Sequence, residues 1–187
     1  MKATDILKDE HSLILVMLQV VDAACAKMES GEHVDHGDIE DMIDFIRNFA
    51  DRCHHAKEEN LLFPAMEKAG ISRDRGPIGV MLAEHTAGRN FVKGMDRALQ
   101  QLKKGDDAAT EMFIADGQGY ASLLDGHIMK ENNVLFPMAD ELLSPEEQKG
   151  LVEGFERVER DEIGAGVHEK YHELLHRLRD RYAPDAK

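Results

Sequence analysis

The sequence predicts an all-α fold: an antiparallel up-down four-helix bundle with an additional C-terminal helix. Apolar residues recur at three- and four-residue steps through almost all of the 187 residues, which is the period of amphipathic helices. Runs of alternating Val, Ile and Thr between turn residues, which are typical of strands, are missing. Short connections place consecutive helices as antiparallel neighbours. We expect a single domain, with the bundle in residues 1–143 and a helical extension in residues 144–187.

The first two helices are delimited by capping and breaking residues. Thr4 is the expected N-cap of the first helix, and Gly31 follows its predicted end at residue 30. The buried face of this helix is expected to contain Leu7, His11, Ile14, Leu18, Val21 and Cys25. The second helix is expected over residues 38–62, after which Phe63-Pro64 kinks it or opens a short extra turn that ends at Gly70.

The next two helices repeat this design. The third is expected from Pro77 to Lys104, before Gly105, and the fourth from near Asp106 to Phe136-Pro137. On the third helix the expected buried face contains Ile78, Leu82, His85, Arg89, Val92 and Leu99. On the fourth it contains Phe113, Tyr120, Leu124, His127, Glu131 and Val134. Both faces therefore mix apolar residues with histidines and charged residues.

A fifth helix is predicted from Ser144 to about Tyr182. It begins with Ser144-Pro145-Glu146-Glu147, which combines an N-cap, a proline in the first turn and acidic residues that favour a helix N-terminus. Because this helix is very polar, we expect it to pack outside the bundle or to be used between the subunits of a homodimer.

Composition excludes some classes of partner. The formal charge of -14 and the pI near 5.1 argue against nucleic acid or an anionic membrane surface as a partner. No apolar run is expected to reach the length of a membrane span, and no signal peptide is recognised. Cys25 and Cys53 stand in helices without a CxxC partner. These features predict a cytoplasmic protein.

An internal repeat is the most informative feature of the sequence. The segment His54-His55-Ala56-Lys57-Glu58-Glu59-Asn60-Leu61-Leu62-Phe63-Pro64 aligns with His127-Ile128-Met129-Lys130-Glu131-Asn132-Asn133-Val134-Leu135-Phe136-Pro137. Upstream of these segments, Glu10-His11-Ser12 matches Glu84-His85-Thr86. Each half of the chain therefore has one histidine followed by an HxxxE motif.

The repeat predicts a metal site. Residues i and i+4 of a helix lie on one face, about 6 Å apart along the axis, so each HxxxE motif presents an imidazole and a carboxylate together. A single such motif is more often a surface ion pair or a core histidine, but here the motifs coincide with apolar faces at matched positions. Burying two carboxylates without cations is costly. The expected ligands are His11, His54, Glu58, His85, His127 and Glu131, with two iron ions favoured and manganese or zinc as substitutes.

These residues resemble the hemerythrin HHE family, and the resemblance covers about residues 1–143. It implies a non-haem di-iron centre in which the four histidines are terminal ligands and the two glutamates bridge. Oxygen-carrying members have a further histidine and an aspartate where this chain has Arg89 and Asn132. The pattern is therefore more similar to hemerythrin-like proteins linked to peroxide breakdown, oxygen or redox sensing, and iron or nitric-oxide handling. The implied ligands are O2, peroxide or NO, and whether the chain is an enzyme, a sensor or a non-catalytic iron-binding module stays open.

Several other residues have alternative interpretations. The C-terminal segment His168-Glu169-Lys170-Tyr171-His172 matches the HExxH motif of zinc metallopeptidases, but His168 is also a possible seventh ligand of the bundle site or a surface residue. Tyr120 is interpreted as a core residue or as a residue that hydrogen-bonds or binds near the metals. Arg89 is interpreted as a surface ion pair or as a tether for a carboxylate or an anionic substrate. His55 points about 100° away from its neighbour in an α-helix, so we expect it to lie outside the ligand set or on the surface.

Overall fold

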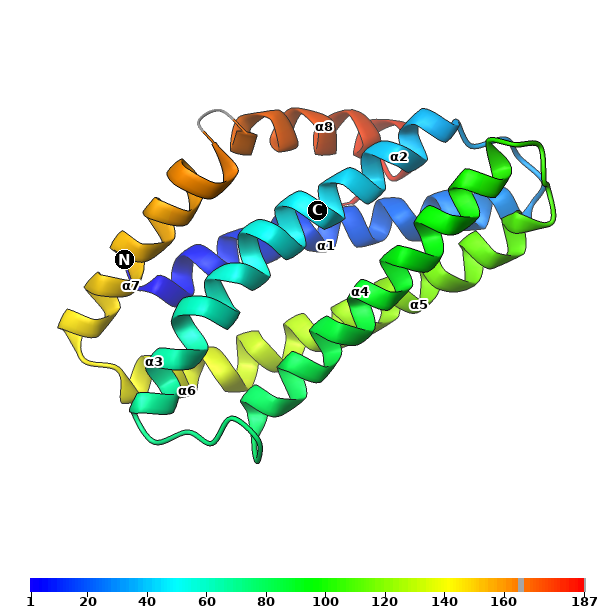
Figure 1. Ribbon diagram of the computed structural model, residues 1–187. Coiled ribbons are helices and arrows are strands. Elements are labelled where there is room, and N and C mark those ends of the chain that lie inside the picture. Colours follow the sequence, from blue (N-terminus) through cyan, green and yellow to red (C-terminus); the bar gives the residue numbers. More distant parts are fainter. Residues whose placement is uncertain (165–166, 187) are drawn as a thin grey trace.

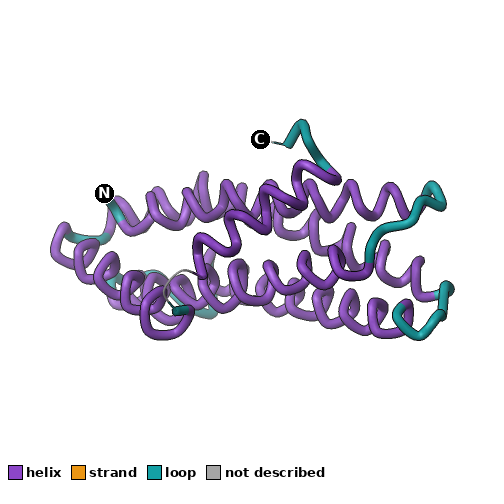
Figure 2. Tube along the Cα trace, turned by 90° about the horizontal axis from the view of Figure 1, so that it is seen from above, coloured by secondary structure: helices purple, strands orange, loops and turns teal. Residues whose placement is uncertain are grey.

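The computed structural model describes residues 1–164 and 167–186, except for the side chains of residues 162, 163, 167 and 168. It is helical throughout, and no strand occurs in the described ranges, which confirms the all-α prediction. The four long helical segments run side by side, as Figure 1 and the view from above in Figure 2 show. They are α1 (Ala3–Glu29), the consecutive pieces α2 (His36–Phe45), η1 (Ile46–His55) and η2 (Glu58–Leu62), α4 (Pro77–Leu102), and α5 (Ala109–Lys130).

Helix ends follow the expected chemistry with small shifts. The α1 helix begins at Ala3 after Lys2, so the prediction of Thr4 as its N-cap is wrong. The α2 helix is capped by Asp35, whose side chain accepts hydrogen bonds from the backbone amides of Gly37 and Asp38. The glycines after α1 and α4 have φ values of 79° and 84°, a region that residues with a side chain rarely adopt. These glycines end the helices as predicted.

The proline of each repeat widens the helical turn before it. Pro64 and Pro137 have no amide hydrogen and crowd the carbonyl four residues back, so the regular hydrogen bond cannot form there. Instead the amide of Phe63 bonds to the carbonyl of Glu58, five residues back, and in the second repeat Phe136 bonds in the same way to the carbonyl of Glu131. The turns η2 and η3 (Glu131–Leu135) are therefore π-helical. They lead into the short helices α3 (Phe63–Lys68) and α6 (Phe136–Leu142).

The apolar core is divided into two clusters along the bundle. One cluster includes Ile14 and most of the apolar residues after it in α1, together with facing residues of α2, η1, α4, α5 and α8. The other includes Ala3 and Leu7 of α1, together with residues of α3, α6, the start of α4 and α7. The stretch of bundle between the clusters holds the buried histidines and glutamates. Val134 is 51% exposed, so the prediction that it belongs to a buried face is wrong, and the adjacent Leu135 is buried in its place.

The C-terminal extension is not one continuous helix, contrary to the prediction. It consists of α7 (Pro145–Arg157), η4 (Val158–Ile163) and α8 (Val167–Tyr182), and Gly164 ends η4 with a φ of 101°. Ser144 caps α7 as expected, by a capping box with Glu147. Figure 1 shows α7 and α8 at an angle to each other, and α8 packs on α1 and α2. Helical periodicity in so polar a segment could not locate the break at Gly164.

The α1 helix requires a correction to the composition argument. By length and apolar composition alone it could cross a membrane, because it contains an 18-residue window of mean hydropathy 1.4. Half of that window is buried inside the protein, and α1 packs against α5 and α8. Buried core helices of bundles pass the same test of length and composition.

Candidate metal centre

Polar side chains from all four long helical segments meet in the gap between the two apolar clusters. Six of them are the residues that the repeat singles out, and each of these is at most 1% exposed. They belong to two groups of possible ligands, within each of which the candidate atoms lie within 4.8 Å of one another. The first group is His11, His54, Glu58 and Glu131, and the second is His55, Glu58, His85 and His127.

Each carboxylate lies between histidines of the two groups. The oxygens of Glu131 lie 3.1 Å from His11 Nε2 and 3.1 Å from His127 Nε2. The oxygens of Glu58 lie 3.4 Å from His85 Nε2 and 3.7 Å from His54 Nε2. Each carboxylate therefore faces one histidine of each group.

Two histidines are oriented by the glutamates that belong to the repeat. His54 Nδ1 donates a hydrogen bond to Glu10 over 2.9 Å, and His127 Nδ1 donates to Glu84 over 2.9 Å. The second oxygen of Glu10 pairs with Lys57, and that of Glu84 pairs with Lys130. The repeat therefore encodes the ring orientation of the histidines as well as the histidines themselves.

The other two histidines of the repeat are oriented from matched positions. His85 Nδ1 donates to Glu59 over 2.7 Å, and His11 Nδ1 donates to the side-chain oxygen of Asn132 over 2.9 Å. Because these partners accept the hydrogen at Nδ1, the Nε2 atom of each ring keeps its lone pair. Metal-binding histidines are typically fixed in this way. Asn132 therefore orients the His11 ring through its side-chain oxygen.

The interior of the site contains hydrogen-bond acceptors and lacks donors for them. No hydrogen-bond partner exists among the described residues for Nε2 of His11 and His54 or for the four carboxylate oxygens of Glu58 and Glu131. Buried polar atoms are nearly always paired, and each unpaired one costs about 1–3 kcal/mol. Converging lone pairs and carboxylates without donors match the requirement of a cation. The residues present therefore fit a metal centre.

Burial perturbs the acid–base properties of these groups. Burial raises the pKa of Glu58 well above its ordinary value of 4.5, and the negative charge of Glu131 raises it further. Burial lowers the pKa of His54 well below 6.5, and the charge of His11 adds to this effect. In the absence of metal His54 thus favours the neutral form, which is the form that binds metal ions, and Glu58 favours the protonated form.

His55 is a possible ligand that the sequence interpretation missed. It is buried, its Nδ1 lies 3.3 Å from Asp51 Oδ1, and its ring stacks on His85 with 3.9 Å between the ring centroids. The surface alternative of that expectation is therefore wrong, and the other alternative, a buried place outside the ligand set, stays a prediction. That expectation assumed an α-helix, but η1 is π-helical, and a turn with more residues separates neighbouring side chains by a smaller angle. His54 and His55 can therefore both face the interior.

The two groups of possible ligands differ around His55. Asp51 accepts hydrogen bonds from His55 and from Arg89, whose guanidinium also donates to Glu59 over 2.8 Å. Burial raises the pKa of Asp51, but these hydrogen bonds outweigh it and hold the pKa well below its usual range. In the second repeat, the position matched to His55 is Ile128. One group therefore has three imidazoles and the other has two.

Comparison with known proteins agrees with this geometry. The model of the hemerythrin HHE cation binding domain family matches residues 2–139. The chain belongs to this family. No solved structure matches it significantly.

Individual relatives of this HHE-family chain are similar to it over only part of their length. An uncharacterised protein of Mycobacterium tuberculosis is 24% identical over 162 residues, which are 87% of this chain and 63% of that protein. The iron-sulfur cluster repair protein YtfE of Enterobacter sp. is 36% identical over 89 residues, or 46% of this chain and 40% of that protein. YtfE of Salmonella paratyphi B is 39% identical over 90 residues. The chain spans less than two thirds of the length of these relatives.

The HExxH motif has no support as a second metal site in this HHE-family chain. Of its residues, the side chain of His168 lies outside the described part of the structure, and Glu169 is exposed. Among the described residues, no group of possible metal ligands includes His172. A role for His168 as a seventh ligand of the bundle site stays a prediction.

The orienting residues of the HHE site could have been found from the sequence. Glu10 and Glu84 immediately precede matched histidines, and Lys57 and Lys130 are identical in the two repeats. Each lysine lies three residues after an HxxxE histidine, so it stands near the same helix face. The repeat thus contained a pattern for the partners of the ligands.

Proposed function

We propose that this chain binds two iron ions between Glu58 and Glu131, within an antiparallel bundle that the C-terminal extension covers from outside. The observation that carries the proposal is the set of buried histidine nitrogens and carboxylate oxygens that converge without donors. Two groups of candidate ligands share Glu58, and Glu131 faces one histidine of each group, which supports two ions rather than one. Mixed imidazole and carboxylate ligands in a bundle core suit iron first, with manganese or zinc as substitutes.

The proposed chemistry is the binding or reduction of O2, peroxide or NO. Two neighbouring irons, when bound, supply a redox couple that can exchange two electrons with such a molecule. The chain's own residues hold the imidazoles in place by hydrogen bonds to Nδ1 and exclude bulk water by the apolar clusters on both sides. Seven protein side chains leave coordination positions for a small molecule. The two positions are not equivalent, because His55 gives one of them a third imidazole.

Iron handling is a second candidate function. The relatives named iron-sulfur cluster repair proteins are similar to less than half of this chain, so their named role is a proposal here and no more. A chain with this role would release iron to an acceptor rather than turn over an oxidant. A cytoplasmic location and a homodimer stay predictions from the sequence.

Rapid mixing tests the proposed function. Anaerobically reduced, iron-loaded protein is mixed with O2, H2O2 or NO in a stopped-flow spectrometer, and in parallel with a coloured iron chelator. We expect an absorption change with at least one of the three molecules that is lost in the Glu58→Ala plus Glu131→Ala variant. Inertness toward all three, together with rapid loss of iron to the chelator, would favour iron handling. Retention of two irons per chain by the double variant would refute the site itself.

A further inference from the structure

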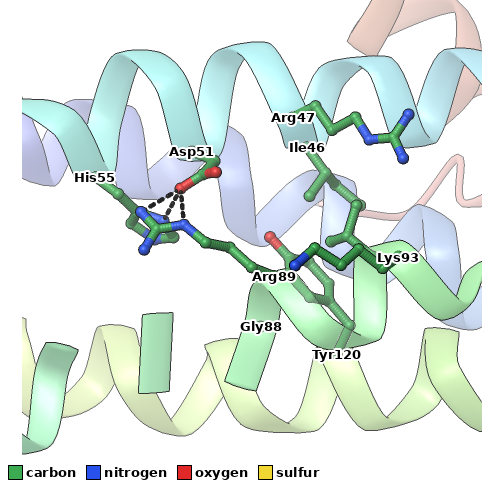
Figure 3. Close-up of a pocket in the computed structure, with 9 residues that line it drawn as sticks. Ile46, Arg47, Asp51, His55, Gly88, Arg89, Lys93 and Tyr120 are labelled. Carbon is green, nitrogen blue, oxygen red and sulfur yellow. Dashed lines mark hydrogen bonds and ion pairs between the residues drawn. The ribbon is translucent and has the colours of Figure 1, made fainter. Parts of the chain in front are cut away.

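A pocket of about 230 Å³ opens beside His55, between η1 and the helices α4 and α5. Figure 3 shows the pocket from the side, with His55 and Asp51 at one end and Lys93 reaching in from the other. Its walls are partly apolar, because Ile46 and Val92 contribute to them. With about 30 Å³ per water molecule in the liquid, the volume suits a molecule of a few carbon atoms.

The positive charges around the pocket are paired in all cases but one. Arg89 is paired with Asp51 and Glu59, and Arg47 lies 2.9 Å from Asp96. Lys93 also lines the pocket, and it has no ion-pair partner in the described ranges of the chain. Lys93 is an exposed residue, so without a ligand water solvates its ammonium group. It gives the pocket one positive charge that a ligand can match.

The Tyr120 hydroxyl is a second polar group without a partner. Tyr120 is 2% exposed, and no hydrogen bond to its hydroxyl is formed by the residues that the structure describes. Figure 3 shows the ring standing upright in the pocket with its oxygen directed away from α5. Burial raises the pKa of Tyr120, and the charge of Asp51 raises it further, so the hydroxyl remains a donor. The hydroxyl oxygen is not one of the fully buried, unpaired atoms of the described residues, so it reaches the pocket and can donate to an acceptor there.

Gly88 provides the space for this ring. A Cβ atom at Gly88 would lie 3.5 Å from Cε2 of Tyr120 and 3.3 Å from Cδ2 of Leu124. The second of these contacts is tighter than an ordinary van der Waals contact, so a side chain here would press on the wall that holds the tyrosine. The pocket is thus formed by the close approach of α4 and α5, which share the most extensive helix contact of the bundle.

We propose that this pocket binds a short-chain monocarboxylate, with its carboxylate between the Lys93 ammonium and the Tyr120 hydroxyl and its apolar part against Ile46 and Val92. One unpaired cation matches one negative charge. An ammonium and a hydroxyl both donate to carboxylate oxygens, and hydrogen bonds to a charged group are the stronger kind. The inference goes beyond the proposed function, because the residues of the pocket carry it and not the metal ligands.

Carboxylate binding can be measured by nuclear magnetic resonance on the full-length protein, both metal-free and zinc-loaded, with butyrate as the probe. Butyramide has nearly the same shape without the charge, so it is the control ligand. We expect butyrate to shift the amide signals of Gly88 and Val92 in both forms. We expect the Lys93→Gln and Tyr120→Phe variants to bind about tenfold more weakly, the effect of losing a hydrogen bond to a charged group. The Lys149→Gln variant, which changes an exposed lysine elsewhere, should bind as the unchanged chain does.

Three results would overturn the inference. They are equal binding of butyramide and butyrate, unchanged binding by Lys93→Gln, and binding that requires zinc and survives both pocket substitutions. The last result would show that the carboxylate binds the metal, and it would leave the proposed function intact. Conversely, pocket binding in a protein that takes up no metal would support this inference while the proposed function fails.

Discussion

Replacing Glu58 by glutamine should stabilise the metal-free protein, although Glu58 is a proposed ligand. Both of its oxygens are buried, and they find no hydrogen-bond donor among the described residues. Burial raises the pKa of this carboxyl well above 4.5, so at pH 7 the metal-free chain must bury a charge or retain a proton at a cost. An unpaired buried group of this kind costs about 1–3 kcal/mol. Glutamine keeps the shape and removes the charge.

The stabilisation of the metal-free protein by Glu58→Gln should depend on pH. When a carboxyl has a raised pKa in the folded state, the folded chain binds more protons than the unfolded one, so stability falls as the pH rises above 4.5. The advantage of Glu58→Gln should therefore be small at pH 4.5 and largest near pH 7. There it should raise the melting temperature of the metal-free protein by about 2–4 °C for each kcal/mol. With iron bound the order should reverse, because the variant has lost a ligand.

Glu59→Gln is the matched control, since the two glutamates are neighbours. Glu59 accepts hydrogen bonds from His85 and Arg89, and although burial opposes it, these bonds lower its pKa. Its charge contributes stability above pH 4.5 that is lost as the pH falls, so Glu59→Gln should destabilise the metal-free protein by about 1–3 kcal/mol. Calorimetry of chelator-treated and iron-loaded proteins at several pH values measures both changes. If Glu58→Gln instead destabilises the metal-free protein, the Glu58 carboxylate has a stabilising partner even without metal, and the reasoning is refuted.

Three further predictions concern the residues around the centre. Lys57 is fully buried, whereas its repeat partner Lys130 is 44% exposed. In denaturant unfolding, Lys57→Ala should lower the free energy of unfolding by about 3–5 kcal/mol and Lys130→Ala by about 0–1 kcal/mol. Equal losses would contradict the difference in burial. His55→Ala should reduce iron content toward one ion per chain by mass spectrometry, whereas two tightly held ions would exclude His55 as a ligand. Asp38 accepts hydrogen bonds from Tyr182 and Arg177 of α8. These hydrogen bonds outweigh the effect of burial and lower the pKa of Asp38. The contribution of Asp38 to stability is therefore lost as the pH falls below 3.8. Hydrogen exchange should show that Asp38→Asn loosens α8 by about 1–2 kcal/mol above that pH and not below it, and unchanged exchange would show that Asp38 does not anchor α8.

The repeat made much of the site predictable. His11 and Glu131 are far apart in the sequence, but each follows the 3.6-residue period of an apolar face, and matched positions identify them as members of one set. The all-α fold follows from the same periodicity. The helix ends at Gly31 and Gly105 and the changes of helix before Pro64 and Pro137 were predictable for a local reason, because glycine permits positive φ values and proline lacks an amide hydrogen.

Features that depend on non-standard backbone or on tertiary contacts could not be predicted. His55 faces the interior because η1 is π-helical, and no pattern of apolar residues shows that in advance. The break at Gly164 lies in a polar segment whose side chains carry little periodic information. Arg89 was expected to form a surface ion pair or to tether a carboxylate or an anionic substrate. It pairs with the carboxylates of Asp51 and Glu59, which the sequence could not single out because they lie in another helical segment.

The central claim is that two unlike iron positions share Glu58 and Glu131, one with three imidazoles and one with two. Mössbauer spectroscopy of the iron-loaded protein tests this most directly, because it counts iron environments separately. We predict two signals of equal area in the unchanged chain, with the signal of one position altered by His55→Ala and the other preserved. A single signal, or one iron per chain that the variant leaves unchanged, would contradict the claim.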